Sequence, residues 1–115
     1  MRRIYIGAGA AALIAGAAAA HHGWGSYDST KVIVLDGPVL ASSYEFPHGE
    51  LEMEGHGKCW TVTLAPPSRM QTRGLAREDI AVGKRIKAEG YASTVKADEM
   101  RAERVTVAGR VVEMR

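Results

Sequence analysis

The stretch Lys31–Phe46, KVIVLDGPVLASSYEF, decides the fold that this sequence predicts. Its first half is rich in β-branched residues, which favour strands. The dipeptide Gly37-Pro38 interrupts the run, and a proline cannot donate a hydrogen bond to a sheet ladder. We interpret the stretch as one long strand with a bend or bulge at that dipeptide. Such a strand is typical of a small β-barrel, in which the first strand coils around the sheet.

Two further strands are predicted in the next segment, Phe46–Leu64, FPHGELEMEGHGKCWTVTL. Leu51 and Met53 alternate with glutamates, which indicates a half-buried strand. The glycines around His56 predict a turn, after which the chain returns as a second strand. We expect the alternating glutamates to form a solvated face, because like charges at this spacing disfavour close packing. These glutamates are Glu50, Glu52 and Glu54.

A short helix separates these strands from the last ones. Pro66-Pro67 ends the preceding strand, and Ser68–Arg73 is predicted to form about two helical turns, with Ser68 as the cap and Gly74 closing the helix. Two or three more strands are predicted between residues 85 and 114, with a turn at Ala108-Gly109. All of these positions are read directly from the sequence.

This order of elements predicts a mainly β protein with a small OB-type β-barrel of five to six strands and one short helix. A small β-sandwich is the alternative fold. We divide the chain into a predicted signal peptide at residues 1–20, an N-terminal arm at 21–31 and the barrel domain at 32–115. The residues predicted to form the core are Val32, Val34, Val62, Leu64, Ile86, Val105 and Val107.

Residues 1–20, MRRIYIGAGAAALIAGAAAA, have the pattern of a secretory signal peptide. Two arginines precede an uncharged segment that ends in Ala18-Ala19-Ala20, an A-x-A cleavage pattern, so we expect cleavage between Ala20 and His21. A retained membrane anchor is the alternative, although alanine and glycine insert poorly into lipid. We therefore expect a periplasmic or secreted protein that contacts a membrane only through an uncleaved signal peptide.

The charge balance argues against nucleic acid as a partner. The chain has 15 basic and 13 acidic residues, and loss of Arg2 and Arg3 with the signal peptide leaves 13 of each. A neutral chain lacks the basic patch typical of nucleic-acid or anionic-membrane binding. Cys59 is the only cysteine, so an internal disulfide is excluded, and its place in an apolar strand pattern predicts burial.

Several short motifs resemble a family of small exported bacterial proteins of unknown function, with an A-H-H mature start and an N-P-H-like motif. The resemblance extends over nearly all of the predicted mature chain and implies an OB-like periplasmic domain without a settled activity. The chain departs from the family at Gly23-Trp24 and at Phe46, where asparagine is more common, and it carries the extra His56. The matching pieces are Ala20-His21-His22-Gly23-Trp24, Phe46-Pro47-His48, Trp60, Arg73-Gly74 and Gly83–Tyr91.

The histidines are the candidate metal ligands. Cleavage before His21 would place a free amine beside its imidazole, and the two nitrogens can chelate one metal ion. His48 is the expected remote ligand, and nitrogen-rich sites suit divalent copper, with zinc and nickel next. His22 offers a competing chelate, formed by the terminal amine, the deprotonated amide between His21 and His22, and the His22 imidazole. Asp28 is a further oxygen donor if the arm folds back.

Other residues are weaker candidates. His56 lies between two glycines and is expected at a turn tip. The methionines after the signal peptide are scattered and are expected to fill the core. No catalytic or phosphate-binding motif such as G-x-S-x-G, G-x-G-x-x-G or C-x-x-C occurs. We therefore expect no enzyme, although an N-terminal copper brace is a distant catalytic alternative. These methionines are Met53, Met70, Met100 and Met114.

Two functions follow from the sequence. The first is a periplasmic copper-binding protein in metal homeostasis or delivery, with His21, His22 and His48 as ligand candidates. The second is a non-catalytic envelope module that binds a protein or a small ligand, with the histidines incidental. Aromatic side chains would then stack on the ligand. They are Trp24, Tyr27, Tyr44, Phe46 and Tyr91.

Overall fold

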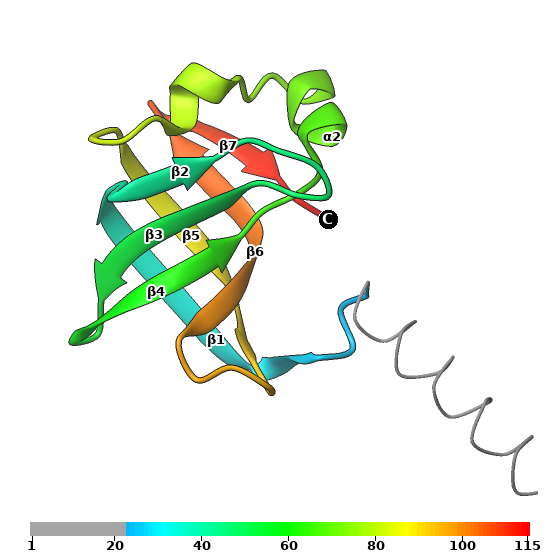
Figure 1. Cartoon of the computed structure of the whole chain (residues 1–115), viewed down its shortest axis with the longest axis vertical. Helices are drawn as coiled ribbons and strands as arrows, with labels where there is room; N and C mark the ends of the chain where they lie inside the picture. Colours follow the sequence, from blue (N-terminus) through cyan, green and yellow to red (C-terminus); the bar gives the residue numbers. More distant parts are fainter. Residues whose placement is uncertain (1–22) are drawn as a thin grey trace, which may run out of the picture.

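The computed structural model of the protein describes residues 23–115, in which strands carry most of the chain (Figure 1). The predictions for residues 1–20 and for His21 and His22 lie outside the described residues. The elements in chain order are β1 (Tyr27–Pro38), β2 (Ala41–Ser43), β3 (Glu50–Gly55), β4 (Lys58–Thr63), α2 (Pro67–Thr72), the 3-10 helix η1 (Arg77–Ile80), β5 (Arg85–Ser93), β6 (Glu99–Val107) and β7 (Arg110–Glu113).

The strands form one sheet in the order β1-β5-β6-β4-β3-β2, with β7 paired to β6. The pairing of β4 with β6 is parallel, and the other pairs are antiparallel. The two ends of this order, β1 and β2, are consecutive in the chain. Between them, Val39 donates its N–H to the Lys84 carbonyl beside β5 at 2.9 Å, and Leu40 donates to Glu52 in β3 at 2.8 Å. The sheet therefore curls into an OB-type barrel, as the order of elements predicts.

The first strand differs from its prediction in extent and in orientation. It begins at Tyr27, earlier than expected, and the predicted single strand is divided into β1 and β2. Val32 and Val34, predicted to be buried, are 62% and 41% exposed, whereas Leu35 is buried. Successive side chains of a strand point to opposite faces, and a run of four apolar residues does not show which set faces the core. Pairing with β5 decides it, because Leu35 lies opposite the buried Ala88.

The rest of the core agrees with the sequence pattern. The alternation in β3 and β4 places Leu51, Met53, Trp60 and Val62 inside the barrel, and Glu50, Glu52 and Glu54 outside it. The methionines fill the core, and the predicted core residues after β1 are buried. These buried residues are Val62, Leu64, Ile86, Val105, Val107, Met53, Met70, Met100 and Met114.

Cys59 is exposed, so the prediction of burial was wrong. It stands opposite Glu54 in the β3–β4 ladder, on the outward face, and the next residue, Trp60, takes the inward position. Cys59 shares its face of β4 with Thr61, while Trp60 and Val62 take the inward positions, because side chains alternate along a paired strand.

Two tight hairpins and a helix shape the ends of the barrel. His56 and Gly57 have φ values of 51° and 81°, and Ala108 and Gly109 have 50° and 80°. Positive φ at both central residues is the requirement of the tight turn that matches strand twist. Helix α2 spans Pro67–Thr72, one residue earlier than predicted, and begins without a side-chain cap, since prolines preset its first turn. Within residues 23–115, neither helix has the length or the apolar character that crossing a membrane requires.

Candidate functional site

A cavity of about 340 Å³ lies between the loop that joins β2 to β3 and the loop that joins β5 to β6. His48 comes from the first loop, and Val95 and Lys96 come from the second. The start of β1 closes a third side. The pair of loops that frames the cavity is the ligand-binding position of OB-type barrels in general. The remaining lining residues are Ser26, Tyr27, Glu50, Ser93 and Glu99.

Gly49 holds His48 in place. The Gly49 N–H donates to the Ala65 carbonyl at 2.9 Å, and its carbonyl accepts from the Leu64 N–H at 2.8 Å. A Cβ added at Gly49 would lie 2.8 Å from the terminal methyl of Met70 in α2. The backbone therefore approaches the helix more closely than a larger residue allows, and this close approach fixes the position of the His48 loop.

The opposite loop is held by two local contacts. The Ser93 hydroxyl oxygen accepts hydrogen bonds from the N–H groups of Val95 and Lys96, both at 3.0 Å. The Lys58 ammonium donates to the Ala97 carbonyl at 2.6 Å and ties the loop to β4. Side-chain acceptors of this kind organise turns that lack ladder hydrogen bonds. Hydrogen bonds at Ser93 and at Ala97 thus fix the two ends of the loop segment that carries Val95 and Lys96.

Glu99 is the hub of a hydrogen-bond network at the cavity. Its Oε2 accepts from the Tyr27 hydroxyl at 2.8 Å and from the Thr63 hydroxyl at 2.7 Å. Burial raises the pKa of Tyr27 to about 12, and the hydrogen bond to Glu99 and the charge of Glu99 add to this shift. The network joins β1, β4 and β6 and keeps the phenol neutral to a higher pH than an ordinary tyrosine.

The Tyr27 phenol is expected to ionise at a pH well above that at which an ordinary tyrosine ionises. Because its folded-state pKa of about 12 exceeds the ordinary 10.0, stability from this group is complete below pH 10 and is lost as the pH rises toward 12. Phenolate absorbance followed against pH measures the shift. The difference curve between the protein and Tyr27→Phe should show one step near pH 12, and Glu99→Gln should move that step down. A difference curve centred at pH 10 would contradict the network.

His48 is the one imidazole among the described residues that line the cavity. The side chain is half-buried, and its Nδ1 is buried without a hydrogen-bond partner among the described residues. Glu50 and Glu99 line the same cavity. Residues 23–115 contain no group of three or more His, Cys, Asp or Glu side chains arranged to hold a metal ion. Within the described residues, His48 is therefore not part of a ready-made set of three ligands.

The other predicted donors lie elsewhere. His56 is exposed at the tip of the β3–β4 hairpin, and its Nε2 lies 3.0 Å from the Val34 carbonyl oxygen. The Asp28 carboxylate accepts from the N–H and the hydroxyl of Thr30, at 2.9 and 2.6 Å. These hydrogen bonds lower the pKa of Asp28 and make it part of a local turn. Neither residue lines the His48 cavity.

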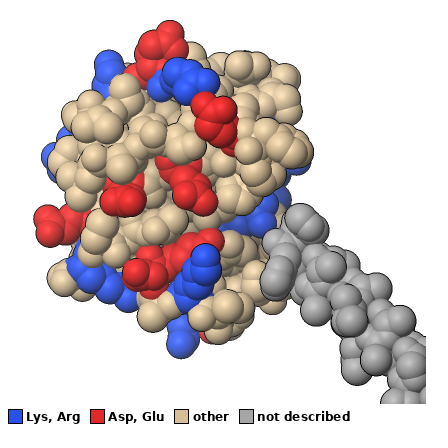
Figure 2. All heavy atoms as spheres, in the orientation of Figure 1, with Lys and Arg blue, Asp and Glu red and all other residues tan. Residues whose placement is uncertain are grey.

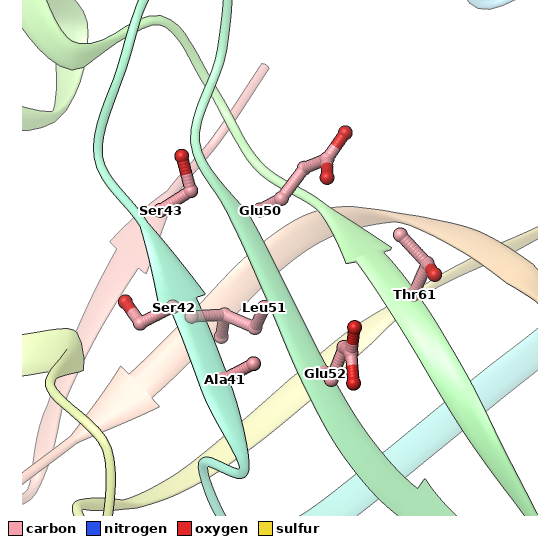
Figure 3. A pocket seen from close by; sticks show the side chains of 7 residues that line it. All are labelled: Ala41, Ser42, Ser43, Glu50, Leu51, Glu52 and Thr61. Atoms are coloured by element: carbon pink, nitrogen blue, oxygen red, sulfur yellow. The ribbon is translucent and has the colours of Figure 1, made fainter.

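A second, shallower hollow of about 140 Å³ lies on the outer face of β2, β3 and β4. Figure 3 shows the Glu50 and Glu52 carboxylates and the Thr61 hydroxyl on this face. Glu50 lines both hollows, so the two features adjoin. Carboxylates occupy the middle of the face in Figure 2, and the described residues give Glu50 and Glu52 no ion-pair partner. The electrostatic potential at this face is therefore negative.

The five aromatic side chains that were predicted to stack on a ligand lie in three different environments. Trp24 packs edge-on against Tyr27 and Tyr91, with ring centroids 6.1 and 6.2 Å apart. Tyr44 is buried and donates its hydroxyl to the Leu75 carbonyl, so it does not serve as a stacking surface, which corrects the sequence expectation. Phe46 is 87% exposed in the loop that carries His48.

Sequence reasoning did not identify Glu99 or Arg101 as site residues. Glu99 meets Tyr27 across 72 positions of the chain, and the Arg101 guanidinium donates to the Gly23 carbonyl across 78 positions. Alternation in β6 places both side chains on one face, opposite the buried Met100. Their partners depend on where β1 crosses β5 and β6, and no local pattern contains that information.

The fold and the site define a small, mainly β domain of the OB type with a cavity between two of its loops. The chain belongs to the "Family of unknown function (DUF6152)", whose model matches residues 10–102. No curated protein matches the chain. The family match agrees with the resemblance to an uncharacterised family.

Two solved structures are similar to the chain. The crystal structure of the ZRD-deleted mutant of TiaS in complex with agmatine is 17% identical, with a TM-score of 0.54, over 76% of this chain and 27% of that one. The crystal structure of TiaS in complex with a tRNA and ATP is 22% identical, with a TM-score of 0.46, over 77% of this chain and 20% of that one. The chain thus spans about a quarter of the length of the solved chains it matches, and the first likeness concerns the fold alone.

Proposed function

We propose that this protein is exported and binds one divalent copper ion at the His48 cavity, in a homeostasis or delivery role. The ligands are the amine and imidazole of His21, made terminal by cleavage after Ala20, together with His48. His22 competes with His21 for the same ion. Zinc or nickel is a weaker alternative for this nitrogen-rich set. The function is binding, without a catalytic step.

The observation that carries the proposal is the wall that the N-terminal segment contributes to the cavity. Ser26 and Tyr27 line it together with His48. His22 precedes Ser26 by four positions, and an extended chain of that length reaches about 14 Å. The arm is also held against the barrel, since the Gly23 carbonyl accepts from Arg101 at 3.2 Å. The short separation in sequence between His22 and a residue that lines the cavity supports a ligand set that combines the mature N-terminus with His48.

The donor set at the cavity suits a copper ion. His48 offers an imidazole whose Nδ1 makes no hydrogen bond to the described residues. Glu50 and Glu99 add negative charge that favours a bound cation, although two hydrogen bonds already engage Glu99. When bound, copper would supply Lewis acidity and a redox centre. The residues themselves would hold the ion and exclude water from it.

Export is the first premise to be tested. The A-x-A pattern at Ala18-Ala19-Ala20 predicts a periplasmic product whose intact mass corresponds to residues 21–115. Mass spectrometry of the envelope fraction measures this directly. A product that keeps Met1 to Ala20 in the membrane would remove the terminal chelate and with it the proposed ligand set.

Copper binding is the second premise. Calorimetry and electron paramagnetic resonance on residues 21–115 should show one bound Cu²⁺. His48→Ala should weaken binding by about tenfold or more. An alanine added before His21 should weaken it as much, because the terminal chelate is lost. Binding should also fall below about pH 6, as the imidazoles take up protons.

His56→Ala is the matched control, because His56 is exposed and lies outside the cavity. It should bind copper as the unmodified protein does, and all variants should melt at a similar temperature. Equal copper affinity of the N-terminally extended protein and residues 21–115 would contradict the chelate. Loss of binding in His56→Ala would place the site elsewhere.

A second candidate function is a non-catalytic envelope module with incidental histidines. The observation that favours it is the pair of exposed apolar side chains on the two loops, Phe46 at 87% and Val95 at 74%. Exposed apolar groups at the mouth of a cavity are typical of ligand or protein contacts. Failure of residues 21–115 to bind any of the three metals would favour this function over the first.

A further inference from the structure

Two arginines, Arg101 and Arg115, lie over the Trp24 ring, and a third, Arg69, is close to Arg101. The Arg101 guanidinium carbon lies 4.5 Å from the centroid of the Trp24 ring, and that of Arg115 lies 4.1 Å from it. Arg101 also lies 5.7 Å from the Tyr27 ring. Arg69, on α2, is close enough for its charge to act on Arg101. The indole is thus held by two guanidinium groups, with a third nearby.

The positive charge of this group is poorly compensated. Among the described residues, the one carboxylate that pairs with any of the three arginines is Glu103, at 3.8 Å from Arg115. Arg69 donates to the Met114 carbonyl at 2.9 Å and Arg101 to the Gly23 carbonyl at 3.2 Å, and both acceptors are neutral. Like charges held together in this way disfavour the folded state unless an anion joins them.

Arg101 is the central member of the group. Its side chain is half-buried, and burial lowers its pKa; Tyr27 and Glu99 oppose this shift, and the positive charges of Arg69 and Arg115 add to it. A desolvated guanidinium gains more from a bound anion than a solvated one. Stacking on Trp24 restrains the planes of Arg101 and Arg115, so less conformational entropy is lost when they bind a ligand.

We propose that Arg69, Arg101, Arg115 and Trp24 form a binding site for a phosphate oxyanion, either free phosphate or the phosphomonoester group of a larger molecule. The three guanidiniums outnumber the two carboxylates that act on them, Glu103 and Glu99, so the group keeps a net positive charge that favours a bound oxyanion such as a phosphate monoester. Planar guanidiniums bind tetrahedral oxyanions through paired N–H donors. The site has the opposite sign to the carboxylate-lined His48 cavity and does not depend on a metal ion.

The test uses the protein treated with a chelator, at constant ionic strength held with chloride. Inorganic phosphate and glycerol 2-phosphate are titrated separately, and the indole N–H resonances of Trp24 and Trp60 are followed by NMR. Trp24 should shift and saturate at millimolar phosphate or below. Trp60 should stay in place, because it is buried and donates to the Gly55 carbonyl. Tighter binding of the monoester would indicate a phosphate carried by a larger molecule.

The variants distinguish specific phosphate binding from a general effect of positive charge and from a change in folding. Arg101→Ala should abolish saturation, and Arg101→Lys should weaken it about tenfold, since the charge stays and the paired donors are lost. Arg104→Ala is the matched control, because Arg104 is on the same strand and pairs with Glu113 at 3.0 Å. Arg69 lies on α2 and donates to the Met114 carbonyl, whereas Arg101 donates to Gly23 of the arm, so Arg69→Ala should weaken binding even if Arg101→Ala disturbs the arm.

The proposal is overturned if the Trp24 shift rises linearly with phosphate and matches the shift with chloride alone. It is also overturned if Arg104→Ala lowers the affinity as much as Arg101→Ala and Arg69→Ala do, because the effect is then general screening. Copper titrations on the same variants distinguish this site from the proposed function. Arg69→Ala should leave copper binding unchanged.

Discussion

Val62→Asp is expected to destabilise the protein by about 4 kcal/mol or more, which is a large part of the stability of an ordinary small domain at about 5–15 kcal/mol. Val62 is fully buried on β4, opposite Leu51 in β3 and Met100 in β6. An aspartate there would place a carboxylate among apolar side chains without a partner, and desolvation of an unpaired charge is strongly unfavourable.

Urea unfolding followed by circular dichroism measures this loss. Val111→Asp is the matched control, because Val111 is 59% exposed on β7 and the same change there should alter stability by less than about 0.5 kcal/mol. A Val62→Asp protein that unfolds at the same urea concentration as the unmodified one would show that β4 does not face the core.

The second large effect is expected at Gly90. A Cβ added there would lie 1.9 Å from the Arg101 carbonyl oxygen and 2.7 Å from the Ala102 Cα, both of them backbone atoms of β6. The β5–β6 register shifts between Glu89 and Gly90, so the strands approach closely at this irregularity. Backbone cannot move aside as a flexible side chain can. Gly90→Ala should therefore destabilise the protein by about 3 kcal/mol or more.

Gly37→Ala is the control for Gly90→Ala. Gly37 is also in a strand, and a Cβ built on it meets no heavy atom within 4 Å. Alanine there should change stability by about 1 kcal/mol or less. Thermal melting of the two variants compares them directly. Equal melting temperatures would mean that β5 and β6 separate without loss of stability. Because Arg101 is one of the two residues nearest Gly90, the indole resonance of Trp24 should also move in the Gly90→Ala protein.

The strand pattern was predictable wherever apolar and polar residues alternate. Leu51 and Met53 alternate with glutamates, and this alternation agrees with their burial in the structure. The run VIVL at 32–35 has no polar residue, so its two faces are equivalent in the sequence, and the wrong face was predicted to be buried. Cys59 was misplaced for a different reason: the apolar character of cysteine suggested burial, although the residue shares the outward face of β4 with Thr61.

The candidate site was predictable only in part. His48 was identified because histidine is a metal ligand, and the structure places it in a cavity between two loops. Glu99 and Arg101 gave no signal, since charged residues at alternating positions in a strand usually form a solvated face. Their roles arise from Tyr27 and Trp24, which lie more than 70 positions away in the chain.

The sequence by itself determined the order of elements, the turns and the alternating strands, because these depend on neighbours within a few residues. Glycines at 57 and 109 permit the positive φ of two hairpins, and Pro66-Pro67 ends a strand. Tertiary structure alone decided which face of β1 is buried, which carboxylate binds Tyr27, and which arginines meet Trp24. Those outcomes depend on the pairing of β1 with β5 and of β5 with β6, which brings segments distant in the chain together.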